Sequence, residues 1–298
     1  MKRTKAVLII GGSGFVGSHL ARRLRNKYKV FATYYQHQIR IPEVTMLPLD
    51  VTERNWIKRV IYGIQPDVII YAAGKNNPQW ADDHSRDAEQ IHTNGAASVS
   101  TVASILQPRM IYLSNSHVFD GSRGNYKEED VILPHSPLGK MKVSGENYIR
   151  TRSLNYIILR SGPLLGIGNG IEMTLIDRLR IALSKGKKLE LSPYDFQSYT
   201  SIYGIIDLIE KLIEGGPRNK VLHYGGLNKL SEYELGIEFA KYFGYDPSII
   251  LEKRYAGEEN DLYYSDYSLN FTQAISTLKA QPFFLKQCFD LIKQNFVG

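Results

Sequence analysis

Apolar runs of strand length alternate with amphipathic stretches of helix length along the first half of the chain. Runs rich in β-branched residues lie at residues 5–10, 29–34, 44–48, 67–71, 109–113 and 155–159. Stretches with the apolar spacing of helices lie at residues 15–27, 53–63, 85–106 and 138–152. From Val68 to Tyr71 every position is apolar, as in a strand that is buried on both faces. This βαβ alternation predicts an α/β fold with a Rossmann-type, doubly wound parallel sheet.

The alternation loosens after about residue 160. Residues 162–170 are rich in glycine and proline and have the turn chemistry of a loop. Helical patterns follow at residues 171–185, 203–214, 232–243 and 283–295, with short strands between them. We therefore predict a Rossmann domain over residues 1–160 and a smaller C-terminal α/β part over residues 161–298, interleaved with the first.

The composition of the 298 residues is that of an ordinary globular protein, with 43% hydrophobic and 22% charged residues. The single cysteine, Cys288, cannot form an intrachain disulfide or a cysteine-based zinc site. No apolar run approaches the ~20 residues of a membrane span. The apolar run near the N-terminus, at about five residues, is shorter than the ~7–15 of a signal peptide. We therefore expect a cytoplasmic protein without membrane contact.

The net charge of +7 suits an anionic partner, whether nucleic acid, a membrane surface or a phosphorylated small molecule. The basic residues are spread along the chain, and the densest patch, residues 22–27, falls on a predicted helix whose solvated face explains it. We therefore expect no nucleic-acid partner. None of the seven histidines has the spacing of a metal-ligand motif, so no catalytic metal is expected either.

A glycine loop lies between the first predicted strand and the first predicted helix. It has the spacing G-x-x-G-x-x-G from Gly11 to Gly17. The first glycine permits a tight turn, the middle one lets the backbone approach a pyrophosphate, and the third allows close helix–strand packing. The helix start adds free N–H groups and positive dipole. The loop therefore predicts a dinucleotide site made by Gly11, Ser13, Gly14, Phe15, Val16 and Gly17, unless it is a turn that binds nothing.

The second predicted strand carries no carboxylate at its end that could bind a ribose 2′-hydroxyl. His37 and Arg40 lie just beyond it, and either could face a 2′-phosphate. This pattern favours NADP over NAD as the cofactor. The alternative is that both residues belong to a surface loop and contact no ligand.

Longer motifs resemble those of the extended short-chain dehydrogenase/reductase family over nearly the whole chain. Residues 49–52, LDVT, resemble the family's adenine-side loop, and residues 65–74 its PDVVINAA strand, whose end lines the cofactor. Asn94-Gly95 sits where the family has its helix-four asparagine, and residues 114–121 are similar to STDYVFDG. The resemblance is greatest to the branch that holds dTDP-4-dehydrorhamnose reductases and the regulatory beta subunit of methionine adenosyltransferase. Beside the contact from Arg40 that the second strand suggests, it implies further cofactor contacts from Asp50, Val51, Ala72, Ala73, Gly74, Asn94 and Lys142.

The family transfers a hydride between nicotinamide and a sugar carbonyl, with a tyrosine as proton donor. A lysine four residues later on the same helix face lowers the tyrosine pKa, and a serine or threonine orients the substrate oxygen. Lys142, followed by Gly145-Glu146, matches the family's lysine. The tyrosine position is Leu138 and the hydroxyl position is Asn115, so the ordinary proton donor is absent.

His117 is a candidate replacement acid. It lies on the same loop as Asn115, where related dehydratases carry a catalytic glutamate, and histidine exchanges protons near neutral pH. The hypothesis is that His117 donates the proton while Asn115 or Ser116 positions the substrate oxygen. The alternative is a histidine that only packs or anchors the loop. The catalytic candidates are therefore Lys142, His117 and Asn115.

Two functions stay open at this point. The first is a reductase or related enzyme that acts on a nucleotide-linked deoxysugar such as dTDP-4-dehydrorhamnose. For this function, the segments that would contact the substrate are residues 160–166 and 199–203, which resemble the family's substrate-contacting segments. The second is an NAD(P)-binding regulatory or assembly subunit without turnover. A nucleotide-sugar substrate, a protein partner and a homodimer are expected partners by analogy with the family.

Overall fold

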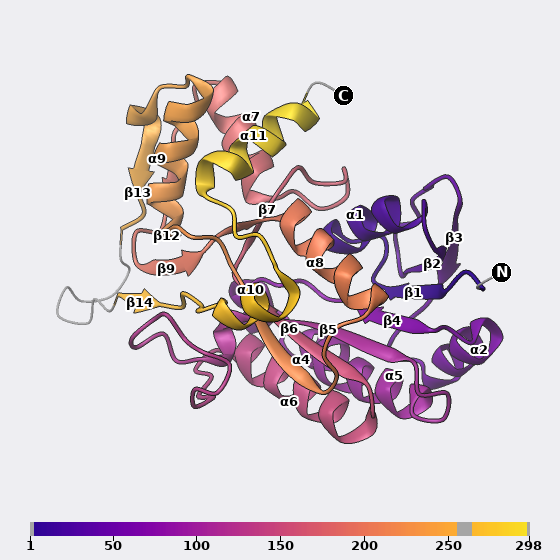
Figure 1. The fold of residues 1–298 in the computed structure, drawn as a ribbon. Coiled ribbons are helices and arrows are strands. Elements are labelled where there is room, and N and C mark those ends of the chain that lie inside the picture. The colour runs from indigo at the N-terminus through magenta and orange to yellow at the C-terminus, as the bar shows by residue number, and fades with distance from the viewer. Residues whose placement is uncertain (1–2, 255–263, 297–298) are drawn as a thin grey trace.

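The fold is built on one parallel sheet of seven strands (Figure 1). The computed structural model describes residues 3–254 and 264–296. The strand order is β11-β6-β5-β4-β1-β2-β3, and all six neighbouring pairs are parallel. The strands are β1 (Ala6–Ile10), β2 (Lys29–Tyr34), β3 (Val44–Pro48), β4 (Val68–Tyr71), β5 (Arg109–Asn115), β6 (Tyr156–Ser161) and β11 (Lys220–Tyr224). The order reverses between β1 and β4, as in a doubly wound Rossmann sheet, so the predicted fold class is confirmed.

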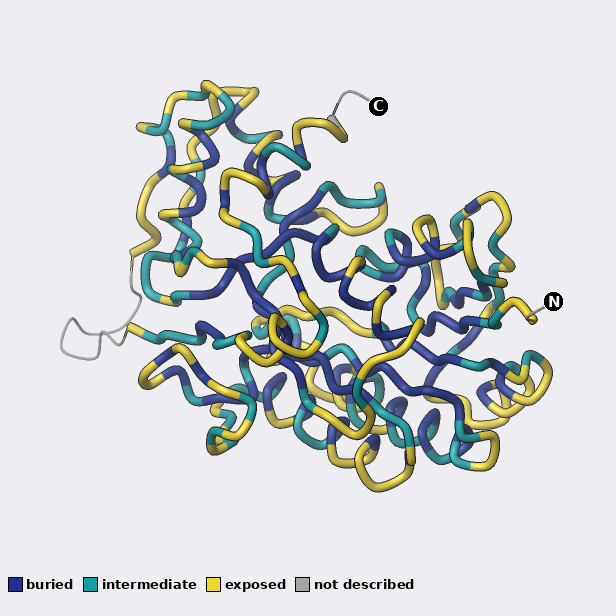
Figure 2. Tube along the Cα trace, viewed as in Figure 1, coloured by how far each residue is buried: buried dark blue, intermediate teal, exposed yellow. Residues whose placement is uncertain are grey.

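Helices cover both faces of this sheet, and strand β1 shows why (Figure 1). Val7 and Ile9 face a core with α1 (Phe15–Leu24) and α8 (Ile202–Glu214). Leu8 and Ile10 face a second core with α2 (Arg54–Ile64), α5 (Ala96–Ala103) and α6 (Pro137–Arg152). All four of these β1 side chains are fully buried, and the tube in Figure 2 is mostly dark blue along the strands of the sheet. An unbroken apolar run is therefore what a strand with helices on both faces requires.

The long helix predicted over residues 85–106 is broken in the structure. It consists of α4 (Ser85–Glu89), a π-helical turn η1 (Gln90–Gly95) and α5, and a short helix α3 (Pro78–Asp83) precedes it. The hydroxyl of Tyr71 donates to the carbonyl of Ile91 at 2.6 Å, and that of Tyr112 donates to the carbonyl of His92 at 3.3 Å. These two buried hydroxyls supply partners for carbonyls at the wider turn.

The smaller part of the chain has its own core beneath α7 (Leu175–Ser184), α9 (Glu232–Phe243) and α11 (Leu285–Phe296). Cys288 is fully buried in it, and burial raises the pKa of this thiol to about 12, so it is inert. Short elements complete the part: β7 (Leu164–Leu165), β8 (Leu189–Leu191), β9 (Asp195–Ser198), β10 (Thr200–Ser201), β12 (Lys229–Leu230), β13 (Ile250–Glu252), β14 (Ser265–Asp266) and α10 (Thr272–Leu278). Two 3₁₀ turns, η2 (Ser116–Val118) and η3 (Pro247–Ile249), lie outside the named strands and α-helices.

The chain returns to the Rossmann sheet after residue 161. Strand β11 pairs with β6, from Lys220 opposite Ile157 to Tyr224 opposite Ser161, and α8 packs in the same core as α1. The C-terminal part therefore supplies the edge strand and one covering helix of the N-terminal sheet. The division at residue 160 itself stays a prediction. No helix within the described residues is both long and apolar enough to cross a bilayer.

Candidate functional site

The glycine loop joins β1 to α1, and its three spaced glycines differ in what surrounds them. Gly11 has φ +87°, and a Cβ there would lie 2.7 Å from the Cα of Ala73. A Cβ on Gly17 would lie 2.1 Å from the carbonyl oxygen of Gly11. A Cβ on Gly14 would meet only that same oxygen, at 3.4 Å. Gly11 and Gly17 are thus required by packing, whereas Gly14 leaves open the side on which a ligand would approach the backbone.

The loop is held from two sides while the start of α1 stays uncovered. Thr33 at the end of β2 accepts from the N–H of Gly11 at 3.1 Å through its hydroxyl and from the N–H of Ser13 at 3.2 Å through its carbonyl. From the C-terminal part, the amide of Asn169 donates to the carbonyl of Ser13 at 2.7 Å. Gly14 is the N-cap of α1 and provides no side-chain cap. A fixed loop with an uncapped helix start fits the pyrophosphate of a dinucleotide.

The segment after β2 carries cations and no carboxylate before Glu43. Tyr35, His37 and Arg40 are all exposed. Neither His37 nor Arg40 makes a hydrogen bond or ion pair within the described part of the chain. Both are therefore free to contact a ligand phosphate, as the sequence predicts, although nothing else in the structure fixes their position.

The predicted adenine-side residues lie at the carboxyl ends of β3 and β4. The carboxylate of Asp50 accepts from the backbone N–H and the hydroxyl of Thr52 at 2.8 and 2.7 Å, and Val51 is buried in the second core. Ala72 and Ala73 are half-buried directly after β4, and Gly74 follows with φ +100°. The structure therefore brings these residues to the same edge of the sheet as the glycine loop.

Asn94 is exposed on η1, whereas His92, two residues earlier, is fully buried. The ring of His92 contacts Gly74, and its Nε2 lies 3.1 Å from the carbonyl oxygen of Lys75. Burial, and then the charge of Lys142, lowers the pKa of His92 to about 3, so the ring is neutral at pH 7. Sequence reasoning missed this histidine; the only signal was Gly95, an interruption in a helical pattern.

Lys142 on α6 lies at the carboxyl end of β5. It is buried, its Nζ donates to the carbonyl oxygen of Leu113 at 3.0 Å, and it lies 5.5 Å from the ring centroid of Tyr112. Burial lowers the pKa of Lys142 to about 8, an effect opposed by the nearby carboxylate of Glu146. Lys142 is therefore positioned by the sheet and is able to exchange a proton near neutral pH.

Leu138, one helical turn before Lys142, is fully buried. It packs in a small apolar cluster with Ala81, Ala88 and Met141, against which Trp80 also lies. The position of the family's tyrosine is thus filled by a core side chain. The hydroxyl of Tyr126, on the loop after β5, does not replace it, because it donates to the carboxylate of Asp120.

Asn115 ends β5, and both ends of its amide group are bonded. Its oxygen accepts from the backbone N–H of His117 at 3.1 Å, and its nitrogen donates to the side-chain oxygen of Asn76 at 2.5 Å. The ring of His117 is half-buried, with its centroid 4.7 Å from that of Tyr267. Burial lowers the pKa of His117 to about 4. At pH 7 this ring is neutral and would have to take up a proton before acting as an acid.

Residues 5–270 match the RmlD substrate binding domain family. The chain belongs to this family. Among curated relatives, the beta subunit of methionine adenosyltransferase 2 from Bos taurus is 24% identical over 247 residues, covering 80% of this chain and 72% of the relative. A dTDP-4-dehydrorhamnose reductase from Aggregatibacter actinomycetemcomitans is 28% identical over 239 residues, covering 78% and 76% of the two chains.

Solved structures support the fold of this RmlD-family chain. A hypothetical dTDP-4-dehydrorhamnose reductase from Sulfolobus tokodaii superposes with a TM-score of 0.79 at 24% identity, over 94% of this chain and 98% of the other. The reductase from Bacillus anthracis, solved with NADP, gives 0.79 at 19% identity over 97% of each chain. UDP-glucose 4-epimerase from Thermotoga maritima gives 0.81 at 18% identity, over 98% of this chain and 99% of the other.

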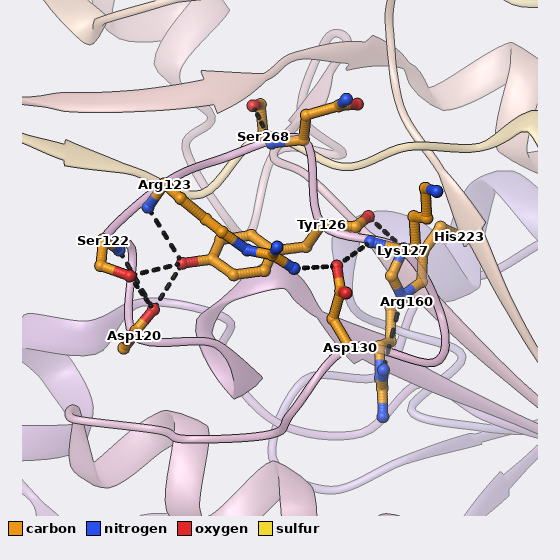
Figure 3. A network of polar contacts seen from close by, with 10 residues as sticks. Asp120, Ser122, Arg123, Tyr126, Lys127, Asp130, Arg160, His223 and Ser268 are labelled. Carbon is orange, nitrogen blue, oxygen red and sulfur yellow. Dashed lines mark hydrogen bonds and ion pairs between the residues drawn. The ribbon is translucent and has the colours of Figure 1, made fainter.

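A polar network joins helix α6 of this RmlD-family chain to β6 and β11, and Figure 3 shows its part around Arg160, His223 and Tyr126. Glu146, one turn after Lys142, forms a two-pronged ion pair with Arg160 of β6 at 2.8 and 2.7 Å, and both side chains are fully buried. Arg160 lies 3.4 Å from Nε2 of His223 on β11, whose Nδ1 lies 3.0 Å from the carbonyl oxygen of Tyr126. The network therefore connects α6, β6, β11 and the loop after β5.

A cavity of about 290 Å³ lies between α1 and α8, away from the glycine loop. Its walls carry three cations, Arg23, Lys27 and Lys211, and three carboxylates, Asp207, Glu210 and Glu214, and Glu210 accepts from both Arg23 and Lys27, so the lining has no net charge. This cavity therefore adds no ligand site to the one described above. No group of three metal-ligating side chains occurs among residues 3–254 and 264–296.

Proposed function

We propose that this protein binds NADP, or alternatively NAD, across the glycine loop. The open side of Gly14, the uncapped start of α1 and the exposed side chains of His37 and Arg40 support this proposal. It is further supported by the structural neighbours, of which one was solved with NADP and another with NAD. Asp50, Val51, Ala72, Ala73, Gly74 and Asn94 are the further cofactor contacts that we propose.

We propose that the second ligand is a nucleotide-linked deoxysugar such as dTDP-4-dehydrorhamnose, and that the protein is a cytoplasmic reductase of its keto group. The observation that carries this proposal is the buried Lys142, held at the end of β5 by the carbonyl of Leu113. Bound reduced nicotinamide would supply the hydride to the carbonyl carbon. Lys142 supplies the proton to the carbonyl oxygen and regains one from solvent, since its lowered pKa suits exchange near neutral pH. Asn115, two residues after Leu113 on β5, is the group that we propose to orient the oxygen.

His117 is the weaker of the two proton donors proposed. Its ring is neutral at pH 7, because burial lowers its pKa to about 4, so it has no acidic proton to give at that pH. We therefore assign the donor role to Lys142 and expect His117→Gln to retain most of the turnover.

The test measures loss of NADPH or NADH absorbance with a panel of nucleotide-linked 4-ketosugars. Lys142→Met is expected to lower the rate by about 10²–10⁴-fold, the usual contribution of a general acid. Lys140→Met, an exposed lysine on the same helix, serves as the matched control and should leave the rate unchanged. Equal rates for Lys142→Met and wild type would rule out the assigned role of Lys142.

The burial of Leu138 favours a second candidate function, an NAD(P)-binding regulatory or assembly subunit. The tyrosine position is part of the core, and curated relatives of comparable similarity are named as a subunit of another enzyme. Tight cofactor binding without turnover on any 4-ketosugar would support this candidate over the reductase. Sedimentation of the purified protein by itself, and of the protein purified together with any bound partner, would then distinguish a homodimer from a complex with a protein partner.

A further inference from the structure

The segment that follows β4 contacts both positions where this chain departs from the family's catalytic pattern. We call residues 74–84, which include α3, the strap. Its Asn76 bonds the side chain of Asn115, and its Trp80 and Ala81 pack in the cluster around Leu138. The carbonyl oxygen of Lys75 also forms a hydrogen bond with the Nε2 of His92. The strap is therefore fastened to three side chains of the candidate site.

In the contact between Asn76 and Asn115, the side-chain carbonyl of Asn76 accepts a hydrogen bond from the amide nitrogen of Asn115, as a substrate carbonyl would. Asn115 is 1% exposed, and its own oxygen accepts from the N–H of His117, which fixes the orientation of the amide. The Asn115 nitrogen must then point outward as a donor, and the carbonyl oxygen of the Asn76 side chain meets it at 2.5 Å. A ketone oxygen oriented by Asn115 would need this same donor.

The rest of the strap holds Asn76 in this position. Asn77 caps α3 by accepting from the N–H of Trp80 at 2.9 Å, and the ammonium of Lys75 lies 5.3 Å from the Trp80 ring centroid. Trp80 stacks on His84 with ring centroids 5.3 Å apart. Asn76 and Lys75 are nevertheless exposed, so the strap closes the position from the solvent side.

We propose that Asn76 is a built-in occupant of the substrate-oxygen position and that a ketone substrate binds only by displacing its carboxamide. This inference rests on the proposed function, since it takes Asn115 as the group that orients the substrate oxygen. It makes Asn76 a specificity-determining residue. Because a ketone oxygen is a weaker acceptor than an amide oxygen, the substrate's other contacts must supply the free energy that displaces Asn76.

The decisive experiment compares the affinities of a nucleotide-linked 4-ketosugar and of dTDP alone, with NADP⁺ present. Asn76→Ala is expected to bind the ketosugar about 10-fold more tightly than wild type, because Asn115 is freed, and to bind dTDP equally. Gln79→Ala is the matched control, since Gln79 is an exposed strap residue that bonds only Asp83 in the same helix, and it should change neither affinity. Unchanged or weaker ketosugar binding by Asn76→Ala would overturn the proposal.

A second measurement needs no ligand. Hydrogen exchange of the strap amides, and acrylamide quenching of Trp80 in a Trp56→Phe background, report how tightly the strap is fastened. Asn115→Ala and Asn76→Ala should each raise strap exchange about 10-fold, and Gln79→Ala should not. Unchanged exchange would show that the Asn76–Asn115 contact does not hold the strap and would overturn the proposal. Failure of wild type to bind NADP would instead overturn the proposed function, and the exchange result would still decide whether the strap is fastened.

Discussion

At the scale of single residues, burial sets the charge of the groups around the end of β5. Lys142 has its pKa lowered to about 8, and His92 and His117 have theirs lowered to about 3 and 4. At pH 7 the lysine is mostly charged and both histidines are neutral. The site therefore holds one cation beside uncharged polar groups, which suits a ligand that carries negative charge.

The buried ammonium of Lys142 makes stability depend on pH above neutrality. The folded pKa of about 8 lies below the unfolded value of 10.5, so the unfolded state binds more protons between them and stability rises with pH over that range. Between pH 7.5 and 9.5 the free energy of unfolding of wild type should gain about 2 kcal/mol relative to Lys142→Met. Urea denaturation at the two pH values measures this difference. A constant difference would contradict a buried, titrating lysine.

His92 has the same consequence on the acid side, because its pKa is also lowered by folding. Its folded pKa of about 3 lies below the unfolded 6.5, so the stability it supports is present above pH 6.5 and is lost as the pH falls toward 3. Relative to His92→Gln, wild type should lose about 2 kcal/mol between pH 7 and pH 4.5. His37→Gln, which changes an exposed imidazole, is the control variant. If the free energy of unfolding changes with pH by the same amount in His92→Gln as in His37→Gln, His92 is not buried in its neutral form.

At the scale of elements, the glycines between β1 and α1 have two different roles: Gly17 is required for packing, and Gly14 for the proposed ligand binding. Gly17→Ala would push a Cβ to 2.1 Å from the Gly11 carbonyl oxygen and should destabilise the protein by about 2 kcal/mol or more. Gly14→Ala meets no such contact and, with φ −75°, should change stability by less than about 0.5 kcal/mol. It should still weaken NADP binding at least 10-fold, because its methyl faces the proposed pyrophosphate. Denaturation and fluorescence titration check the pair, and undiminished NADP affinity in Gly14→Ala would place the cofactor elsewhere.

Helix α2 provides an internal control for glycine substitutions. Gly63 is exposed near the end of this helix, and nothing lies within 4 Å of a Cβ built there. Gly63→Ala should therefore stabilise the protein by about 0.5–1 kcal/mol through helix propensity and leave NADP affinity unchanged. A loss of stability measured by thermal denaturation would contradict the open surroundings of Gly63.

The strands and most of the helices could be predicted from the sequence, because the spacing of buried apolar residues along the chain differs between strands and helices. The run from Val68 to Tyr71 and the helix pattern over residues 138–152 are examples, since the structure has β4 and α6 there. The π turn η1 could not be predicted, because its cause is tertiary: hydroxyls from β4 and β5 bond the carbonyls of Ile91 and His92. Apolar periodicity does not record such contacts.

The candidate site could be predicted only where its residues form a local pattern along the chain. The glycine loop and Lys142 have fixed spacing along the chain, and the structure brings them to one edge of the sheet. The partner of Asn115 is Asn76, 39 residues away, and no local pattern marks that pair. The charge states of His92 and His117 follow from burial, which becomes known only once the elements are packed.

At the scale of the whole molecule, the buried pair of Glu146 and Arg160 ties helix α6 to the sheet and, through His223, to β11. Arg160→Met removes the two-pronged partner of the buried Glu146 carboxylate, which keeps only its weaker interactions with Arg150, at 3.6 Å, and Lys142, and the change should cost about 3–5 kcal/mol. The double variant Glu146→Met/Arg160→Met removes both charges and should recover most of this loss. Lys241→Met, which breaks an exposed pair with Glu238, should cost less than about 1 kcal/mol. A double variant no more stable than Arg160→Met would mean that packing, rather than the unpaired charge, explains the loss.

The position of β11 also bears on how the protein is made. Six neighbouring strands of the sheet are complete once residue 161 has been synthesised, but the open backbone edge of β6 receives its partner only with residues 220–224. On the ribosome, a nascent chain of intermediate length therefore exposes one open backbone edge of β6, of the kind that pairs with other chains. Because the elements from β7 to α8 separate β6 from β11 along the chain, we expect slower translation between residues 161 and 224 to lengthen the time during which the growing chain can aggregate.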